Sequence, residues 1–169
     1  MSFQQALCRV LLGGTLLALA SATFAQLSPD EAEQARATRM AVFRLLSHNM
    51  EPIAGMARGR VPFDAELAER NARNVAALSQ LIPDLFVADT RDAGIYTRAK
   101  DFIWDNWDSF VAHSEELTRN ANLMAEAAAS GDQSALSQAM RRTGPACGAC
   151  HDLFRFQESD PALPVPKPL

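Results

Sequence analysis

Two cysteines and a histidine lie close together near the carboxyl end of the chain, in the order Cys147-Gly148-Ala149-Cys150-His151. In an α-helix the three side chains take positions i, i+3 and i+4, so they project from one face. Thiols at this spacing can add to the two vinyl groups of a haem, and the neighbouring imidazole can bind its iron. The C-x-x-C-H pattern therefore predicts one covalently attached haem c, with His151 as the axial ligand.

Two other uses of a C-x-x-C pair fit this chain less well. A structural zinc site needs four ligands, but the only further histidines are His48 and His113, and the third cysteine is Cys8 in the amino-terminal segment. A thioredoxin-like dithiol needs a βαβ context, which the sequence pattern does not offer. Haem attachment remains the interpretation that the residues favour.

The first 25 residues have the pattern of an export signal. Arg9 is their only charged side chain, residues 10–20 are mostly apolar, and small residues then lead up to Ala25. Secretory signal peptides show this order, and the apolar stretch is shorter than the roughly 20 residues that span a bilayer. We expect cleavage after about Ala25, which gives a periplasmic protein without a membrane anchor. Export also agrees with the compartment in which c-type haem is attached.

The composition is that of one globular domain. The 169 residues are 48% hydrophobic and 21% charged, with a formal net charge of −4 at pH 7. The excess of acid argues against nucleic acid as a partner, because phosphate binding needs a concentrated basic surface. We expect residues 26–157 to form the domain. Residues 158–169 contain four prolines and are predicted to be a disordered tail.

Apolar residues recur at helical spacing in four stretches, which predicts an all-α fold. The expected helices run from Ser28 to Gly59, from Asp64 to Ile82, from Ile103 to Ser130 and onward from Asp132, with a loop from Asp84 to about Tyr96. Short connections make successive helices antiparallel, which predicts an up-down-up-down four-helix bundle. Cys147 and Cys150 share the apolar stripe of the fourth helix, so the bundle should enclose the haem.

A C-x-x-C-H motif near the carboxyl end of a four-helix chain resembles the class II c-type cytochromes, and specifically the cytochrome c′ family. Class I cytochromes c have the motif near the amino end instead. The resemblance covers nearly all of the chain after residue 25. Further matching segments are Arg39 with Phe43, Met50-Glu51-Pro52-Ile53, Leu78-Ser79 through Phe86, Ile103-Trp104, and Cys150-His151-Asp152 with Phe154-Arg155.

The resemblance implies roles for residues outside the motif. It places Arg39 near a haem propionate, Phe43 over the open face of the iron, Phe86 among the haem-binding residues and Arg155 beside the proximal imidazole. Met40 stands where the family usually has a polar residue near the haem edge, and it too is a candidate haem-binding residue. Residues 90–100 form a longer stretch than is usual in the family.

The sixth coordination position of the iron decides between two functions. If Phe43 covers it, the resemblance implies a five-coordinate, high-spin haem that transfers electrons and binds small gases such as nitric oxide and carbon monoxide. The alternative is a low-spin electron carrier with Met40, one helical turn before Phe43, as sixth ligand. In that case gas binding would not be expected.

An enzyme is the less favoured interpretation, and we assign no catalytic residue. A peroxidase needs a distal acid–base group, and His48 lies five residues from Phe43, about 140° away around the helix. The family resemblance also implies a homodimer through the first two helices. Val42 and Leu45, which lie outside the expected apolar stripe of the first helix, offer weak support for it, and the sequence does not identify a redox partner protein.

Overall fold

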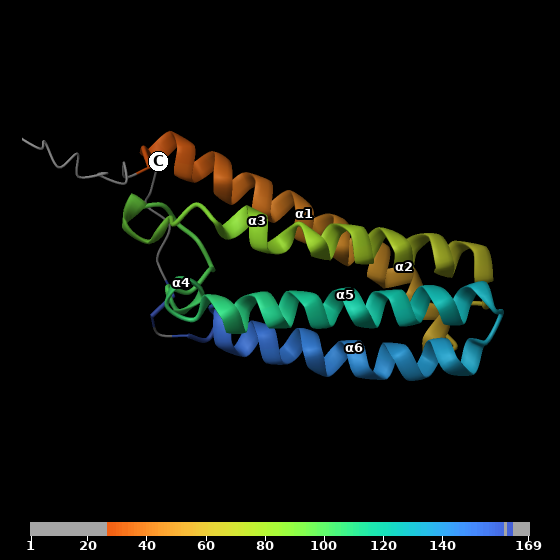
Figure 1. Ribbon diagram of the computed structural model, residues 1–169. Helices are drawn as coiled ribbons and strands as arrows, with labels where there is room; N and C mark the ends of the chain where they lie inside the picture. Colours follow the sequence, from red (N-terminus) through yellow and green to blue (C-terminus); the bar gives the residue numbers. More distant parts are fainter. Residues whose placement is uncertain (1–26, 161, 164–169) are drawn as a thin grey trace, which may run out of the picture.

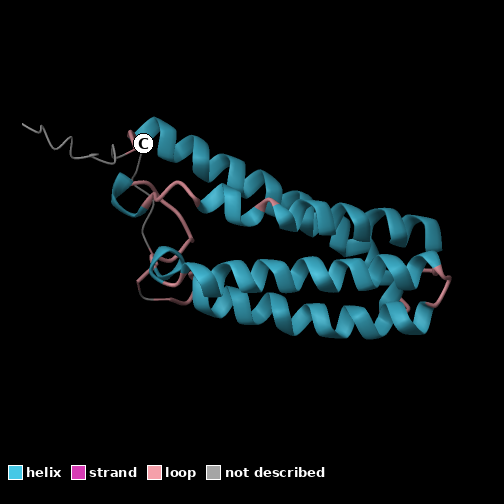
Figure 2. Cartoon of the chain, in the orientation of Figure 1, coloured by secondary structure: helices cyan, strands magenta, loops and turns pink. Residues whose placement is uncertain are grey.

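The computed structural model describes residues 27–160, 162 and 163, so the expected signal peptide lies outside the described residues. Four long helices form most of this described part: α1 (Pro29–Ala57), α2 (Ala65–Gln80), α5 (Trp107–Ala129) and α6 (Gln133–Phe154). The connection from α2 to α5 contains α3 (Ile82–Phe86), the 3-10 turn η1 (Arg91–Ala93) and α4 (Phe102–Asp105). No β-strand occurs in the described part of the chain (Figure 2). The predicted all-α fold is confirmed.

Successive long helices run antiparallel, as Figure 1 shows. Between α5 and α6, the hydroxyl of Thr143 lies 3.9 Å from the sulfur of Met124, while His113 lies against Phe154. Residue numbers therefore rise along one helix as they fall along the other. The hydroxyl of Ser137 donates to the carbonyl of Ala57, so the start of α6 also meets the end of α1. The predicted up-down-up-down bundle is confirmed.

Three of the long helices have the N-terminal side-chain caps that the sequence predicted. Ser28 and Glu31 form a capping box at α1, in which the Ser28 amide donates to the Glu31 carboxylate over 2.9 Å. The carboxylates of Asp64 and Asp132 accept backbone N–H groups at the starts of α2 and α6. Each cap satisfies a donor that has no partner inside its helix.

The second and third expected helices are both interrupted. We expected a helix to Ile82 and a loop from Asp84, but α2 ends at Gln80 and α3 continues to Phe86. Pro83 has no N–H to donate to the carbonyl of Ser79, and that carbonyl accepts the hydroxyl of Ser114 instead.

The predicted third helix is divided at Asn106, whose φ of −133° and ψ of 48° are not helical. The indole of Trp104 donates to the carbonyl of Phe86 over 2.9 Å and ties α4 to α3. This bond joins residues that are 18 positions apart, so apolar spacing within one segment could not reveal it.

The bundle core takes side chains from every long helix. Fully buried members include Ile53, Met56, Val75, Met124 and Leu136. Val42 also belongs to the core, so its placement outside the apolar stripe was wrong, whereas Leu45 is 49% exposed as expected. The reason is that α1 packs against both α2 and α6 and so buries a wider face than a single stripe.

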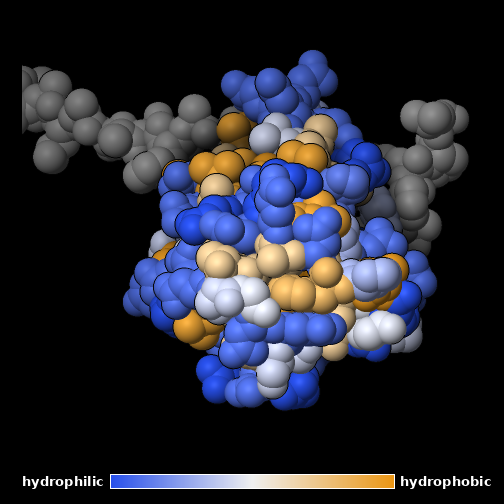
Figure 3. Space-filling view, turned by 90° about the vertical axis from the view of Figure 1, so that its right-hand side faces the viewer, coloured by the Kyte–Doolittle hydropathy of each residue, from blue (hydrophilic) through white to orange (hydrophobic). Residues whose placement is uncertain are grey.

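The two ends of the bundle differ. Figure 3 looks onto the end with the α1–α2 and α5–α6 turns, where hydrophilic residues are interrupted by apolar ones, and Val61 in the α1–α2 turn is 47% exposed. The other end gathers α3, α4 and the carboxyl end of α6 (Figure 1). Cys147, Cys150 and His151 lie in the last two turns of α6, toward this second end. Within the described residues, no helix is both long and apolar enough to cross a bilayer.

Candidate functional site

Cys147, Cys150 and His151 lie on the face of α6 that turns toward the bundle interior. Both thiols are free and half-buried, and Cys150 packs against the hydrophobic core. The same face carries the buried residues Thr143 and Phe154. The helix therefore presents two thiols and an imidazole together at one partly enclosed surface.

Burial controls the protonation of the two thiols. Desolvation raises the pKa of Cys147, and it raises the pKa of Cys150 to about 11, with a further contribution from the neighbouring Cys147. Redox-active dithiols show the opposite behaviour, because they need a lowered pKa to supply a thiolate. In the part of the chain that the structure describes, no group of three or more His, Cys, Asp or Glu side chains is arranged to hold a metal ion. The raised pKa of both thiols is therefore unlike that of a redox-active dithiol.

His151 favours the neutral form of its imidazole. Burial lowers the pKa of His151, the positive charges of Arg155 and Arg98 lower it further, and Asp152 acts in the opposite direction. A neutral imidazole keeps a nitrogen lone pair, which is what a metal ligand requires. Arg155 follows one turn after His151 and its amide donates to the His151 carbonyl over 3.0 Å.

Arg39 is buried and bound to a neighbouring segment of the chain. Its Nε donates to the carbonyl of Leu85 over 2.9 Å, one Nη donates to the hydroxyl of Thr90 over 2.8 Å, and the other donates to the carbonyl of Ala88 over 2.7 Å. Desolvation lowers the pKa of Arg39 to about 10, opposed by the charge of Asp89, so the side chain stays charged at neutral pH. Sequence reasoning missed these partners, because they lie about 50 residues away along the chain.

Phe43 and Met40 occupy different surroundings on α1. The Phe43 ring meets the buried Phe86 edge-on, with centroids 6.4 Å apart, although Phe43 itself is 38% exposed. Phe86 continues the aromatic contacts inward to Phe110, at 5.0 Å. Met40 is 40% exposed, and its sulfur lies 3.8 Å from a guanidinium nitrogen of Arg36. Phe43 is thus joined to the aromatic interior, whereas Met40 contacts a surface side chain.

Asn120 is a polar residue of the interior that sequence reasoning missed. Its side chain is only 7% exposed, and its Nδ2 has no hydrogen-bond partner. Asn120 precedes Met124 by one turn, and Cys147 follows Thr143 by one turn, so the antiparallel register of α5 and α6 sets Asn120 opposite Cys147. A buried donor without a partner suits a site that binds a further group beside the motif. The two thiols, the imidazole and this donor are groups that could hold a haem here.

The family model described as Cytochrome C′ matches residues 34–155 of the chain. The chain belongs to the cytochrome c′ family. Membership makes it a c-type haem cytochrome of the kind associated with electron transport. The matched region begins inside α1 and ends at Arg155, so it includes most of α1, the other three long helices and the C-x-x-C-H motif.

Several cytochromes resemble the chain over most of their length. It is 33% identical to a cytochrome c′ of Rubrivivax gelatinosus, over 69% of this chain and 90% of that protein. It is 35% identical to cytochrome c-554 of Cereibacter sphaeroides, over 71% and 79% respectively. The solved structure of cytochrome c prime from Shewanella frigidimarina superposes with a TM-score of 0.69 and 34% identity, covering 76% of this chain and 98% of the other.

Proposed function

We propose that the chain is a periplasmic cytochrome with one haem c, attached through Cys147 and Cys150 and with iron ligated by His151. The observation that carries the proposal is the position of two free, half-buried thiols and the neighbouring imidazole on one face of α6, where Cys150 packs against the core. The bound group would supply an iron centre that accepts and donates one electron. The chain would fix that centre between the last turns of α6 and the aromatic side chains of the opposite helices.

The surroundings of Phe43 support a five-coordinate, high-spin iron. A phenyl ring has no lone pair to donate to iron, and Phe43 is an aromatic side chain of α1 that contacts the buried Phe86. In this proposal the ring excludes water and bulky or anionic molecules but can be displaced by nitric oxide or carbon monoxide. The exposed Met40, with its sulfur near Arg36, is less well placed to act as sixth ligand.

The proposed activity is electron transfer and gas binding rather than enzyme catalysis. His48 is exposed on α1, and His113 on α5 lies 5.7 Å from the ring of Phe154. Neither position provides the distal acid–base group that peroxide cleavage needs. We further propose that residues 1–25 direct export and are cleaved after about Ala25. A homodimer through α1 and α2 would cover the exposed Leu45, and sedimentation at micromolar concentration tests it.

Haem attachment is tested on the full-length chain expressed with its leader in a bacterium that makes c-type cytochromes. We expect one haem per chain that acidified acetone does not extract. Cys147→Ser and Cys150→Ser should each remove one thioether bond, and the double variant should release its pigment into acetone. Cys8→Ser, a cysteine replacement outside the motif, is the matched control and should change nothing. A colourless purified protein would contradict the proposal.

The coordination state is tested by electron paramagnetic resonance of the ferric protein and by absorption spectra of the ferrous protein with and without carbon monoxide. A high-spin ferric signal and a spectral change with carbon monoxide are expected. A purely low-spin signal at neutral pH that becomes high-spin in Met40→Leu would instead establish the Met-ligated electron carrier.

A further inference from the structure

The carboxyl end of α6 is joined to the connection between η1 and α4 by paired backbone segments. The amide of Lys100 donates to the carbonyl of Phe154 over 3.0 Å, and the amide of Phe156 donates to the carbonyl of Arg98 over 2.8 Å. The guanidinium Nε of Arg98 donates back to the carbonyl of Phe156 over 2.9 Å. We call residues 98–100 and 154–156 the clasp.

The clasp satisfies carbonyl groups of the helix that bears His151. The last four carbonyls of an α-helix have no partner inside the helix. Here the carbonyl of Asp152 accepts the ammonium group of Lys100 over 3.0 Å, and that of Phe154 accepts the Lys100 amide. The last turn of α6, which begins at His151, is therefore fixed by residues that precede it by about 50 positions.

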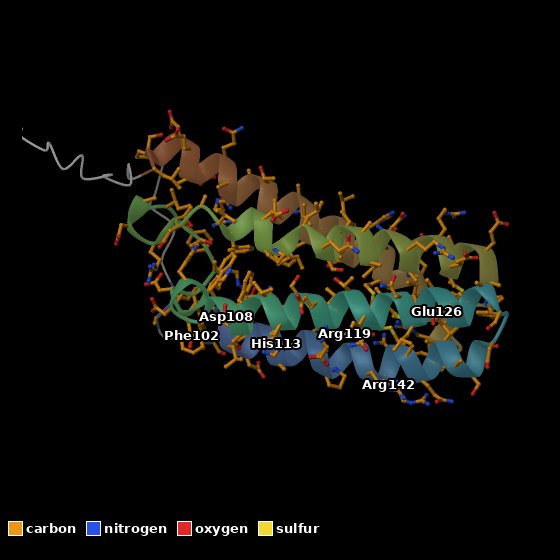
Figure 4. The ribbon with its side chains drawn as sticks, viewed as in Figure 1. Phe102, Asp108, His113, Arg119, Glu126 and Arg142 are labelled. Carbon is orange, nitrogen blue, oxygen red and sulfur yellow. The ribbon has the colours of Figure 1, made fainter. Side chains whose placement is uncertain are left out.

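Apolar packing anchors the same turn from the other side. Phe154 is 3% exposed, and its ring stacks on Phe102 with centroids 5.8 Å apart. It also meets Phe110 at 5.3 Å and His113 at 5.7 Å. Figure 4 shows Phe102 and His113 at the end of the bundle where α4 and α5 meet. The clasp and this packing leave the His151 turn little freedom to move.

Arg98 brings a positive charge to this fixed turn. Its side chain is 30% exposed, and its bond to the Phe156 carbonyl sets its direction. Its ion-pair partner Glu158 is 91% exposed and 3.9 Å away, so it neutralises little of the charge. The amide of Arg155 donates to the carbonyl of His151, and the next residue, Phe156, exchanges hydrogen bonds with Arg98. The clasp therefore holds the charge of Arg98 beside the end of the helical turn that begins at the proposed iron ligand, His151.

We propose that Arg98, held by the clasp, is a positioning residue whose positive charge raises the reduction potential of an iron bound to His151. The inference rests on the proposed haem attachment. Reduction adds an electron to the iron, so a nearby positive charge stabilises the reduced state relative to the oxidised state. Because Arg98 is partly buried and fixed by a hydrogen bond, its charge is screened less than that of a freely exposed arginine.

The test is the midpoint potential of the haem-loaded protein, measured by spectroelectrochemistry at low and at high ionic strength. Arg98→Gln should lower the potential, and Arg98→Lys should restore most of the loss. The matched control is Arg73→Gln on α2, an exposed arginine paired with Glu69, and it should leave the potential unchanged. The difference between the wild type and Arg98→Gln should shrink as salt is added.

The outcomes separate this inference from the proposed function. A wild-type protein without covalent haem would defeat both, whereas a haem-loaded Arg98→Gln with the wild-type potential would overturn only the role of Arg98. Equal losses in Arg98→Gln and Arg98→Lys would also overturn it, since the lost bond to Phe156 rather than charge would then be responsible. If Arg98→Gln does not fold, Glu158→Gln serves instead: removing this negative charge should raise the potential slightly at low ionic strength, and an unchanged or lower potential would contradict the inference.

Discussion

The guanidinium carbon of Arg39 lies 4.3 Å from the centroid of the Phe86 ring and 5.6 Å from that of Trp104. Arg39 thereby joins α1 to α3 and α4 through aromatic contacts, and its three hydrogen bonds join α1 to residues 85–90. Phe86 in turn contacts Phe43, the proposed cover of the iron. The buried guanidinium of Arg39 thus packs against Phe86, the ring that contacts Phe43.

Replacing Arg39 should strongly destabilise the protein. Arg39→Leu would leave the buried hydroxyl of Thr90 and two carbonyls without their donor, which we expect to lower the free energy of unfolding by about 3 kcal/mol. Urea unfolding followed by circular dichroism measures the change. Arg36→Leu, one turn earlier and ion-paired only to Glu33, should cost less than about 1 kcal/mol. Equal effects of the two replacements would show that the buried bonds of Arg39 contribute nothing.

Truncating Phe154 should loosen the turn that carries His151. Phe154→Ala removes a buried ring with three aromatic neighbours, and such replacements cost about 3–5 kcal/mol. Leu153→Ala changes the adjacent residue, which is 41% exposed, and should cost less than about 1 kcal/mol. Thermal unfolding of the haem-loaded variants measures the difference. A Phe154→Ala variant as stable as Leu153→Ala would refute the anchoring role.

The chain without haem should lose stability in alkaline solution. Burial raises the pKa of Cys150 from 9.0 to about 11. The folded chain therefore keeps a proton that the unfolded chain releases, and stability falls as the pH rises from about 9 to 11.

The matching measurement is urea unfolding from pH 8 to pH 11, under reducing conditions, of chain made without its leader so that haem is not attached. Circular dichroism first establishes that this chain is helical. In Cys150→Ala the free energy of unfolding should fall less steeply between pH 9 and 11. Cys147→Ala should reduce the slope by a smaller amount. An unchanged slope in Cys150→Ala would argue that its thiol is not buried as the structure has it.

Shortening Phe43 should open the iron to gases. Phe43→Ala removes the ring that contacts Phe86, so carbon monoxide no longer has to displace it, and the association rate constant should rise. Flash photolysis of the ferrous carbon monoxide complex measures that rate constant. Leu45→Ala, on the same helix and 49% exposed, should leave it unchanged. Equal rates in Phe43→Ala and the wild type would remove Phe43 from the gas-binding path.

The sequence by itself determined the features that depend on neighbouring residues. The capping box of Ser28 and Glu31, the cap at Asp132 and the shared helix face of Cys147 and His151 all involve residues within four positions. Such short-range geometry is set by the pitch of the helix, so reading residue types at fixed spacings was enough. The same periodicity gave the number of long helices and their antiparallel order.

Only the tertiary structure decided which distant segments meet. Four features depend on such meetings: the break at Asn106, the burial of Val42, the bonds of Arg39 to residues 85–90 and the hydrogen bonds between Arg98 and Phe156. Each depends on how the helices sit against one another, and the side-chain spacing within one helix carries no information about that. A charged residue such as Arg39 looks like a surface residue until its partners from another segment surround it.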